Sequence, residues 1–567
     1  MRSAPLVSRK VRQAFVLWAA PLLFIGWFFY QPLLAIFKLV LQITLADGFT
    51  ANLALRVGRP LLFTFWQAGL STLLTFVVGV PAAYVFARFD FRGKRVLRVL
   101  TTLPFILPTV VAAAGFNALL GPRGWLNLGL MFLFNLSEPP VQVLNTLGAI
   151  LIAHVFYNTS VYIRVVGSAW AQFDQRLEDA ARVLGASRWR ALREVTLPLL
   201  APSILAATLL VFLFDFTSFG VVLLLGGPRF ATLEVEIYIQ AMNLFNLPLA
   251  GLLSAIQMLC TLLLTVAHAR LNGGAAQLSP RVRGSDVRKA SSLGERVLVV
   301  AVIITVLVLL VSPLAALGLR SFTRMEAERG ERGEVKTGLT LAYYRELFVN
   351  RRQSLFYVPP IEAVRNSLIY AAATVVISLT LGFLAAYALR LRLRINRLLD
   401  PLLMLPLGAS AVTLGLGFIL VFNRPPFSAQ NFPLLMPIAH SLVALPFVIR
   451  TLQPALASIP TSLRSAAAVL GASPSRVWRE VDMPIMARAA LVGAVFSFTI
   501  SLGEFGATSF LARPEYPTIP VAVFRFISQP GAMNYGQALA MSTLLLAVCA
   551  LSILVMEQVR LPGVDEF

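Results

Sequence analysis

Twelve long apolar stretches dominate the 567-residue sequence. About 20 consecutive apolar residues are needed to cross a bilayer as a helix, and an open sheet edge has no hydrogen-bond partners there. We therefore predict an all-α polytopic membrane protein with about 12 transmembrane helices. The stretches lie near residues 14–37, 61–87, 99–120, 144–166, 200–225, 246–268, 297–318, 364–389, 398–422, 433–456, 486–512 and 536–557.

The charge distribution agrees with this class of protein. Only 13% of the residues are charged, against about 25% in ordinary soluble domains, which argues against a soluble multi-domain enzyme. The formal charge of +22 would fit nucleic-acid binding, but most Lys and Arg fall on one side if the amino terminus is cytoplasmic and the spans alternate. We therefore predict cytoplasmic amino and carboxyl termini, contact with membrane lipid and no nucleic-acid partner.

A polar segment at 269–296, rich in Gly, Ser and Arg, divides the predicted spans six and six. Such a composition is typical of a flexible linker. We predict a first transmembrane module at 1–268, a cytoplasmic linker at 269–296, and a second transmembrane module at 297–567. The first apolar stretch is interpreted as a retained helix, because it is longer than the apolar region of a signal peptide and lacks a convincing small-residue cleavage site.

The two halves contain an internal repeat at a shift of 286 residues. From residue 180 the chain reads AARVLGASRWRALREVTLP, and from residue 466 it reads AAAVLGASPSRVWREVDMP. Because each module has an even number of spans, both copies have the same orientation in the membrane. We expect a pseudo-two-fold axis along the membrane normal, with a substrate passing at the interface of the modules.

The repeated segment has the signals of a helical hairpin between the fourth and fifth spans of each module. Gly185 and Gly471 stand where a first helix would end in the left-handed conformation. Ser187 and Ser473 are candidate N-caps of a second short helix, and Pro474 occupies a favoured first position. We call the segments at about 174–198 and 460–484 the first and second hairpins.

An apolar stripe on the second helix of each hairpin suggests a docking role. Ala191, Leu192 and Val195 recur at helical spacing in the first copy, while the residues between them are polar. An amphipathic hairpin presented twice on one face would fit two identical partner grooves. An alternative is an interfacial hairpin that lies on lipid headgroups.

The hairpin pattern resembles the EAA loop of ABC-importer permeases, in which an acidic residue, two alanines, a glycine and a later proline mark the contact with the ATPase subunit. This sequence departs from the pattern at the acidic position, which is Asp in one copy and Ser in the other. The second hairpin is therefore expected to lack one charge contact with its ATPase. The matching residues are Asp179, Ala180, Ala181, Gly185 and Pro198, then Ser465, Ala466, Ala467, Gly471 and Pro484.

The resemblance covers nearly the whole chain and is closest to the double-length, type I permeases of ferric-iron and thiamine importers. Beyond the hairpins it rests on LGGPRFATLEVEIY (225–238) and SLGEFGATSFL (501–511). The family implies a bacterial inner-membrane location, two copies of a cytoplasmic ABC ATPase and an external substrate-binding protein, periplasmic or lipid-anchored.

A Walker A motif, GxxxxGK[ST], does not occur in the sequence. The chain is therefore predicted to be a transport subunit and not an enzyme. We expect no cofactor on it, with ATP and magnesium on the partner ATPase. Its substrate is ferric iron or a thiamine-class molecule by resemblance, and sulfate, molybdate and polyamine stay open because their permeases share these patterns.

Acidic residues inside apolar stretches are costly in a membrane and mark candidate functional positions. Asp215 lies in the fifth predicted span and Glu504 in the eleventh, where Glu504 aligns with Ser218. We predict that Asp215, Ser218 and Glu504 line the translocation pathway, with a purely structural carboxylate as the alternative. The aligned His154 and His440 are expected to hydrogen-bond between helices, so no metal site is predicted.

Two other classes of function remain for comparison. A proton-coupled secondary transporter would use Asp215 and Glu504 as a relay and would need no ATPase. A membrane scaffold without transport activity is the second. The secondary transporter leaves the paired hairpins without a purpose, and the intramembrane acids and the parallel repeat disfavour the scaffold, so the importer permease is favoured.

Overall fold

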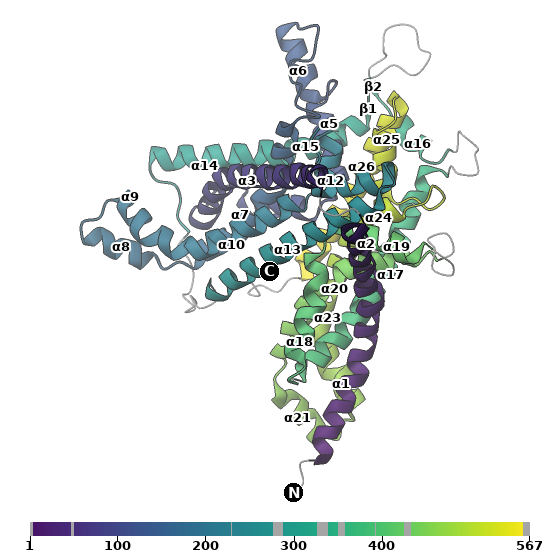
Figure 1. Ribbon diagram of the computed structural model, residues 1–567. Helices are drawn as coiled ribbons and strands as arrows, with labels where there is room; N and C mark the ends of the chain where they lie inside the picture. Colours follow the sequence, from purple (N-terminus) through teal and green to yellow (C-terminus); the bar gives the residue numbers. More distant parts are fainter. Residues whose placement is uncertain are drawn as a thin grey trace.

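The computed structural model is almost entirely helical (Figure 1). It describes residues 4–46, 50–227, 229–275, 287–325, 338–349, 358–391, 393–423 and 432–559. Within these ranges ten helices are long and apolar enough to cross a membrane, and two bent helix pairs raise the number to as many as twelve. The predicted all-α polytopic fold is confirmed.

The described residues up to 275 form thirteen α-helices and three short π-helical segments, labelled η. They are α1 (Ala4–Ile25), η1 (Gly26–Tyr30), α2 (Gln31–Ala46), α3 (Ala51–Arg88), α4 (Lys94–Ile106), α5 (Thr109–Leu120), α6 (Trp125–Phe134), α7 (Leu147–Gln172), α8 (Gln175–Val183), α9 (Arg188–Ala191), η2 (Leu192–Thr196), α10 (Leu197–Phe216), α11 (Gly220–Leu225), α12 (Leu233–Tyr238), η3 (Ile239–Asn243) and α13 (Leu247–Ala275).

The second half repeats this order and adds one antiparallel strand pair, in which Thr323 pairs with Leu339. Its elements are α14 (Leu293–Val306), η4 (Leu307–Val311), α15 (Ser312–Ser321), β1 (Thr323–Arg324), β2 (Gly338–Leu339), α16 (Ala342–Glu346), α17 (Pro360–Arg390), α18 (Asn396–Gly408), α19 (Ala411–Phe422), α20 (Leu435–Ser458), α21 (Thr461–Val469), α22 (Pro474–Val477), η5 (Trp478–Asp482), α23 (Met483–Gly503), α24 (Gly506–Leu511), α25 (Ile519–Ile527) and α26 (Ala532–Val559).

The third and ninth predicted spans are bent pairs of helices. Lys94–Pro104 and Thr109–Phe134 meet at 111°, and α18 and α19 meet at 98°. Proline explains the first break, because Pro108 has no backbone N–H and stands at the N-cap of α5. In the second, the Ser410 hydroxyl accepts the backbone N–H of Thr413 at 3.0 Å and starts α19 in a new direction.

The fifth and eleventh predicted spans, 200–225 and 486–512, are wrong as single helices. Helix α10 ends at Phe216 and α23 ends at Gly503, and a short helix follows each of them. Glu504 causes the second break, because its carboxylate accepts the backbone N–H groups of Ala507 and Thr508 and so starts α24. Both breaks lie within long, predominantly apolar stretches, and the hydropathy averaged over a span therefore does not reveal them.

Two helical arms diverge from a common centre (Figure 1). Helices α3, α7 and α10 pack together in one arm, and α17, α20 and α23 pack together in the other. Each arm is the core of one module. The first hairpin lies at the far end of one arm and the second hairpin at the far end of the other (Figure 1).

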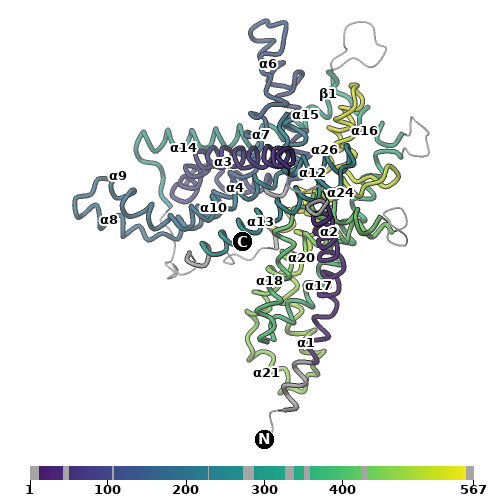
Figure 2. Tube along the Cα trace, viewed as in Figure 1, coloured from purple at the N-terminus to yellow at the C-terminus, as the bar shows by residue number. Residues whose placement is uncertain are grey.

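The first helix of each module packs against the opposite module. Helix α1 lies along α17, and α14 lies along α3 (Figure 2). The Trp18 indole N–H donates to the Asn396 amide oxygen at 3.2 Å, and the Tyr30 hydroxyl donates to the Leu402 carbonyl at 3.2 Å. This exchange ties the two modules into one helical body.

The predicted linker is described only at its ends, and residues 276–286 lie outside the described part. Its last residues dock on the end of α3, where Arg288 N donates to Arg88 O and Asp90 N donates to Arg288 O. The Arg288 guanidinium is held by Glu295 at 2.6 Å, and this hydrogen bond raises the pKa of Arg288. The segment that leads into α14 is therefore fixed to the first module.

Candidate functional site

Both hairpins have the predicted turn. Helix α8 ends at Val183 and α21 ends at Val469, and the glycines that follow have φ of +95° at Gly185 and +81° at Gly471. Few side chains tolerate this left-handed region, so glycine is required by the backbone. The hydroxyls of Ser187 and Ser473 accept the N–H groups of Arg190 and Arg476, which confirms both N-caps.

The prediction of a separate short second helix needs correction. Helix α9 runs through the π-helical segment η2 directly into α10, and α22 runs through η5 into α23. Pro198 and Pro484 stand directly after η2 and η5. Proline lacks the backbone N–H that a continuous α-helix would bond at this position, and the π-helical segment accommodates that loss. Each hairpin is therefore continuous with a helix that is long and apolar enough to cross a membrane.

The most exposed apolar residues of both hairpins lie at the turns, and the predicted stripe of the first hairpin faces the protein, whereas Trp478, aligned with Leu192 in the second hairpin, is 43% exposed. Ala191 is buried, and Leu192 and Val195 are half-buried against the protein. Leu184 and Leu470 are 88% and 87% exposed, directly before the two glycines. Sequence reasoning missed this exposed apolar tip of each hairpin.

One polar side-chain contact joins the two helices of each hairpin, but the residue types that make it differ between the two copies. The Thr196 hydroxyl donates to the Glu178 carboxylate at 3.2 Å. At the aligned positions the Arg464 guanidinium donates to the Asp482 carboxylate at 2.6 Å. The repeat therefore preserves the contact between the two helices while the residues differ.

The acidic position of the motif is exposed in both hairpins. Asp179 lies 3.7 Å from Arg182 within its own helix, and Ser465 is exposed at the aligned position. Ala180 and Ala466 are also exposed next to them. Ala181 and Ala467 are half-buried. Each motif thus presents one side to solvent and the other to the hairpin itself.

The three predicted pathway residues line one cavity between the modules. This intermodule cavity has a volume of about 460 Å³ and is walled by both chain halves. Asp215 and Ser218 contribute from the first module and Glu504 from the second. Its other polar and aromatic lining residues are Thr109, His154, Tyr157, Asn158, Phe214, Thr217, Phe219, Glu234, Phe447, Phe496, Thr499 and Phe505.

Asp215 is fully buried at the end of α10 and is held by the first module. The Asn158 amide donates to its carboxylate at 2.7 Å, and the Thr72 hydroxyl lies at 3.5 Å. His154 Nδ1 lies 3.3 Å from the same carboxylate. These contacts bring α3, α7 and α10 together at one point.

Glu504 is 8% exposed and is held by the second module. Its carboxylate accepts the N–H groups of Ala507 at 2.7 Å and Thr508 at 2.9 Å, and also the Thr508 hydroxyl. His440 Nε2 lies 3.4 Å from it. Glu504 therefore caps α24 in addition to lining the cavity.

The two histidines occupy equivalent positions, but their carboxylate and hydroxyl neighbours are exchanged. His154 has Asp215 near Nδ1 and the Ser218 hydroxyl on Nε2 at 2.8 Å. His440 has the Ser501 hydroxyl on Nδ1 at 2.7 Å and Glu504 near Nε2. Both histidines thus hydrogen-bond between helices, as predicted.

Aromatic rings meet across the module interface beside these networks. The Phe219 and Phe505 rings stack with centroids 5.5 Å apart and an interplanar angle of 25°. Gly220 follows Phe219, and a Cβ there would come within 2.1 Å of the Thr109 hydroxyl oxygen. The stacked pair and the adjacent glycine bring the two helix breaks into close contact.

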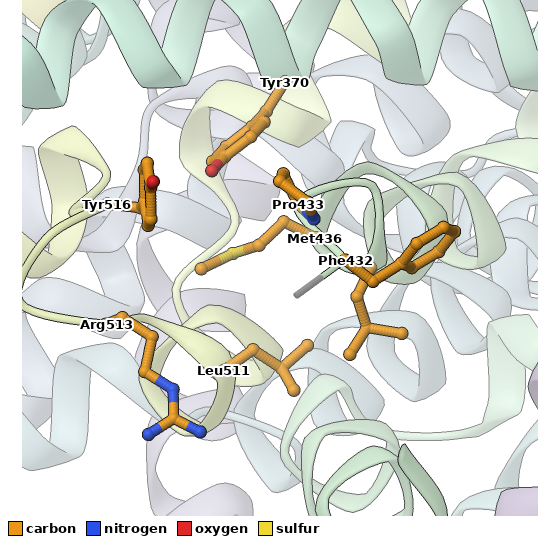
Figure 3. Close-up of a pocket in the computed structure, with 8 residues that line it drawn as sticks. Tyr370, Phe432, Pro433, Met436, Leu511, Arg513 and Tyr516 are labelled. Atoms are coloured by element: carbon orange, nitrogen blue, oxygen red, sulfur yellow. The ribbon is translucent and has the colours of Figure 1, made fainter. Parts of the chain in front are cut away.

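A second recess lies in the second module and is lined by Tyr370, Met436, Leu511, Arg513 and Tyr516 among others (Figure 3). Its volume is only about 10 Å³, near the lower limit for one water molecule. It is too small for a transported solute. The intermodule cavity, which both modules line, is the candidate site.

A family model described as "binding-protein-dependent transport system inner membrane component" matches residues 76–319 and 378–560. The chain belongs to this permease family. A probable ABC transporter permease protein, y4fN of Sinorhizobium fredii, is 27% identical, and the match covers 99% of both chains. The thiamine transport system permease protein ThiP of Escherichia coli is 28% identical over 88% of both chains.

A solved bacterial ABC transporter involved in import of the polysaccharide alginate is also similar. It is 18% identical, with a TM-score of 0.37, and the match covers 48% of this chain and 99% of that one. The two matches to the family model agree with the two tandem modules. As a member of this permease family, the chain is a transport subunit of a multi-pass inner-membrane importer and is not an enzyme.

One lining residue of the permease cavity was not singled out from the sequence. Glu234 lies on α12 within LEVEIY and is fully buried. Its signal was an acidic residue between two apolar stretches, but that segment falls outside the predicted spans. Only the fold shows that α12 turns back toward the module interface.

Proposed function

We propose that the chain moves a thiamine-class organic cation across the inner membrane, powered by a separate ATPase. The observation that carries this proposal is the chemistry of the intermodule cavity. Three carboxylates, those of Asp215, Glu234 and Glu504, line it together with several aromatic rings, and its lining residues include no Lys or Arg. Aromatic faces and carboxylates attract a flat organic cation and disfavour oxyanions such as sulfate or molybdate.

The similarity to thiamine permeases supports the same substrate class. The match to the Escherichia coli protein extends over 88% of this chain, so it includes most of both modules. We propose that Asp215, Ser218 and Glu504 form part of the wall of the pathway. The domain boundaries at 268 and 297 and the cytoplasmic location of both termini remain part of this proposal.

The hairpins are proposed to dock two copies of a cytoplasmic ABC ATPase, with Leu184 and Leu470 at the two contact points. The importer family implies both an ATPase and an external binding protein as partners. We expect ATP and magnesium on the ATPase, and no cofactor on this chain. Closure of the ATPase pair would draw the two arms together, and because η2 and η5 lead directly into α10 and α23, the cavity would change shape.

Reconstitution tests this proposal directly. The chain is purified with the ATPase and binding protein encoded beside it, placed in liposomes, and titrated with thiamine and with ferric iron. We expect thiamine-loaded binding protein to stimulate ATP hydrolysis and thiamine uptake, while ferric iron has no effect. Stimulation by ferric iron alone would contradict the proposed substrate, and uptake driven by a proton gradient without ATPase would contradict the importer mechanism.

A further inference from the structure

Glu234 differs from the other two cavity carboxylates because half of its carboxylate has no partner. Its Oε1 accepts the Gln257 amide at 2.9 Å, whereas Oε2 is buried and accepts no hydrogen bond of ordinary geometry. The nearby Ser410 hydroxyl instead donates to the Thr413 hydroxyl at 3.0 Å. Asp215 and Glu504 use their oxygens within their own modules. A buried carboxylate oxygen without a hydrogen-bond donor is costly in free energy. Its presence in the cavity wall therefore points to a ligand that supplies the donor.

The amide beside Glu234 is also incompletely bonded. Gln257 Oε1 is buried and accepts no hydrogen bond, and Ser254, one turn earlier on α13, has a buried hydroxyl without a partner. The uncompensated atoms of the carboxylate and the amide are acceptors. Of these residues only Glu234 lines the cavity, so a ligand there with a positive charge and an N–H donor would complete its carboxylate.

The position of Glu234 is set by other residues. The backbone N–H of Leu233, the preceding residue, donates to the Thr64 hydroxyl on α3 at 2.9 Å. The second module repeats this contact, because Ile519 N donates to the Ser367 hydroxyl on α17 at 2.9 Å. The residue aligned with Glu234 is Pro520, and α25 docks without a carboxylate. The fold therefore does not require the acid at this position.

We propose that Glu234, supported by Gln257, binds the cationic, donor-bearing part of the substrate in the intermodule cavity. The site occurs once, although the modules repeat, and so it would hold one substrate in one orientation. Nearby aromatic rings such as Phe219 and Phe505 would contact the flat part of the molecule. This inference rests on the proposed function and names the residue that recognises the substrate.

The test compares Glu234→Gln with Glu236→Gln in proteoliposomes that contain the permease, its ATPase and its binding protein. Both variants replace an acid by its amide on α12, but Glu236 already has a partner, the Gln240 amide at 2.6 Å, and does not line the cavity. Uptake of radiolabelled thiamine and ATP hydrolysis stimulated by the loaded binding protein are measured together.

We expect Glu234→Gln to lower thiamine uptake about tenfold, because a charge-assisted hydrogen bond is lost, while stimulated ATP hydrolysis stays within about twofold of wild type. Glu236→Gln should behave as wild type, and Glu234→Asp should retain part of the uptake. Equal uptake by wild type and Glu234→Gln would overturn this inference alone. A parallel loss of uptake, ATP hydrolysis and complex assembly in Glu234→Gln would overturn it as well, since that indicates a structural role.

The wild-type protein separates this inference from the proposed function. If wild type takes up no thiamine, the proposed function fails and the inference fails with it. If wild type takes up thiamine, the ratio of uptake between the two variants decides the role of Glu234 by itself.

Discussion

Replacing Gly185 and Gly471 together with valine is expected to abolish ATP-driven uptake while the membrane helices stay folded. Both glycines have positive φ, and a Cβ at either would meet no atom within 4 Å. The free-energy cost of the substitution therefore comes from the left-handed backbone and not from crowding by other atoms. It is about 1–2 kcal/mol at each turn, and more for a β-branched residue. Because η2 and η5 join the hairpins to α10 and α23, a displaced hairpin no longer transmits movement.

A matched pair of asparagines provides the control. Asparagine tolerates the left-handed region better than valine, so Gly185→Asn with Gly471→Asn should retain much of the uptake. Binding of the ATPase is measured by co-purification and uptake in proteoliposomes. The coupling role of the hairpins is refuted if the double valine variant binds the ATPase and transports like wild type.

The second large effect is expected from Glu504→Ala, which should lower the apparent melting temperature of the purified protein and prevent transport. The carboxylate accepts two backbone N–H groups of α24 and the Thr508 hydroxyl, all in a buried position. Its removal leaves the two backbone N–H groups without an acceptor, while the Thr508 hydroxyl keeps only His440 Nε2 at 2.9 Å. Each unmet buried donor costs about 1–3 kcal/mol, so the total loss of stability should be about 3 kcal/mol or more.

Ser218→Ala is the matched control, because Ser218 is aligned with Glu504 in the repeat. Its hydroxyl makes a hydrogen bond with His154 at 2.8 Å, and its loss should cost only about 1 kcal/mol. Thermal unfolding in detergent is followed for both variants. Similar melting temperatures for the two variants would show that Glu504 does not stabilise the helix break between α23 and α24. Its role would then be limited to lining the pathway.

The hydrogen bonds of Asp215 and Glu504 also bear on the alternative of a proton relay through these two residues. Asp215 is bound by Asn158 and Thr72 of its own module, and Glu504 by α24 of the other. Each carboxylate is hydrogen-bonded to defined partners at the point where a helix breaks. We therefore expect their variants to affect stability first, and transport as a consequence.

Local signals predicted the hairpins accurately. The left-handed glycines and the Ser187 and Ser473 caps depend on a few adjacent residues, and the structure has them as predicted. The continuity of the second hairpin helix with α10 and α23 was not predicted, because a π-helical segment has no sequence signal comparable to a glycine or a proline. The exposed Leu184 and Leu470 were also missed, since exposure depends on how the hairpin leaves the arm.

By itself the sequence determined the class of fold, the repeat, the turns and the family, because apolar length, glycine conformation and motif spacing are local properties. The tertiary structure decided where the helices break, how α1 and α14 exchange between modules, and which acids share a cavity. These features depend on contacts between distant residues, such as His154 with Ser218 or Gln257 with Glu234. Glu234 is the clearest case, since only the packing of α12 at the module interface distinguishes it from its neighbour Glu236.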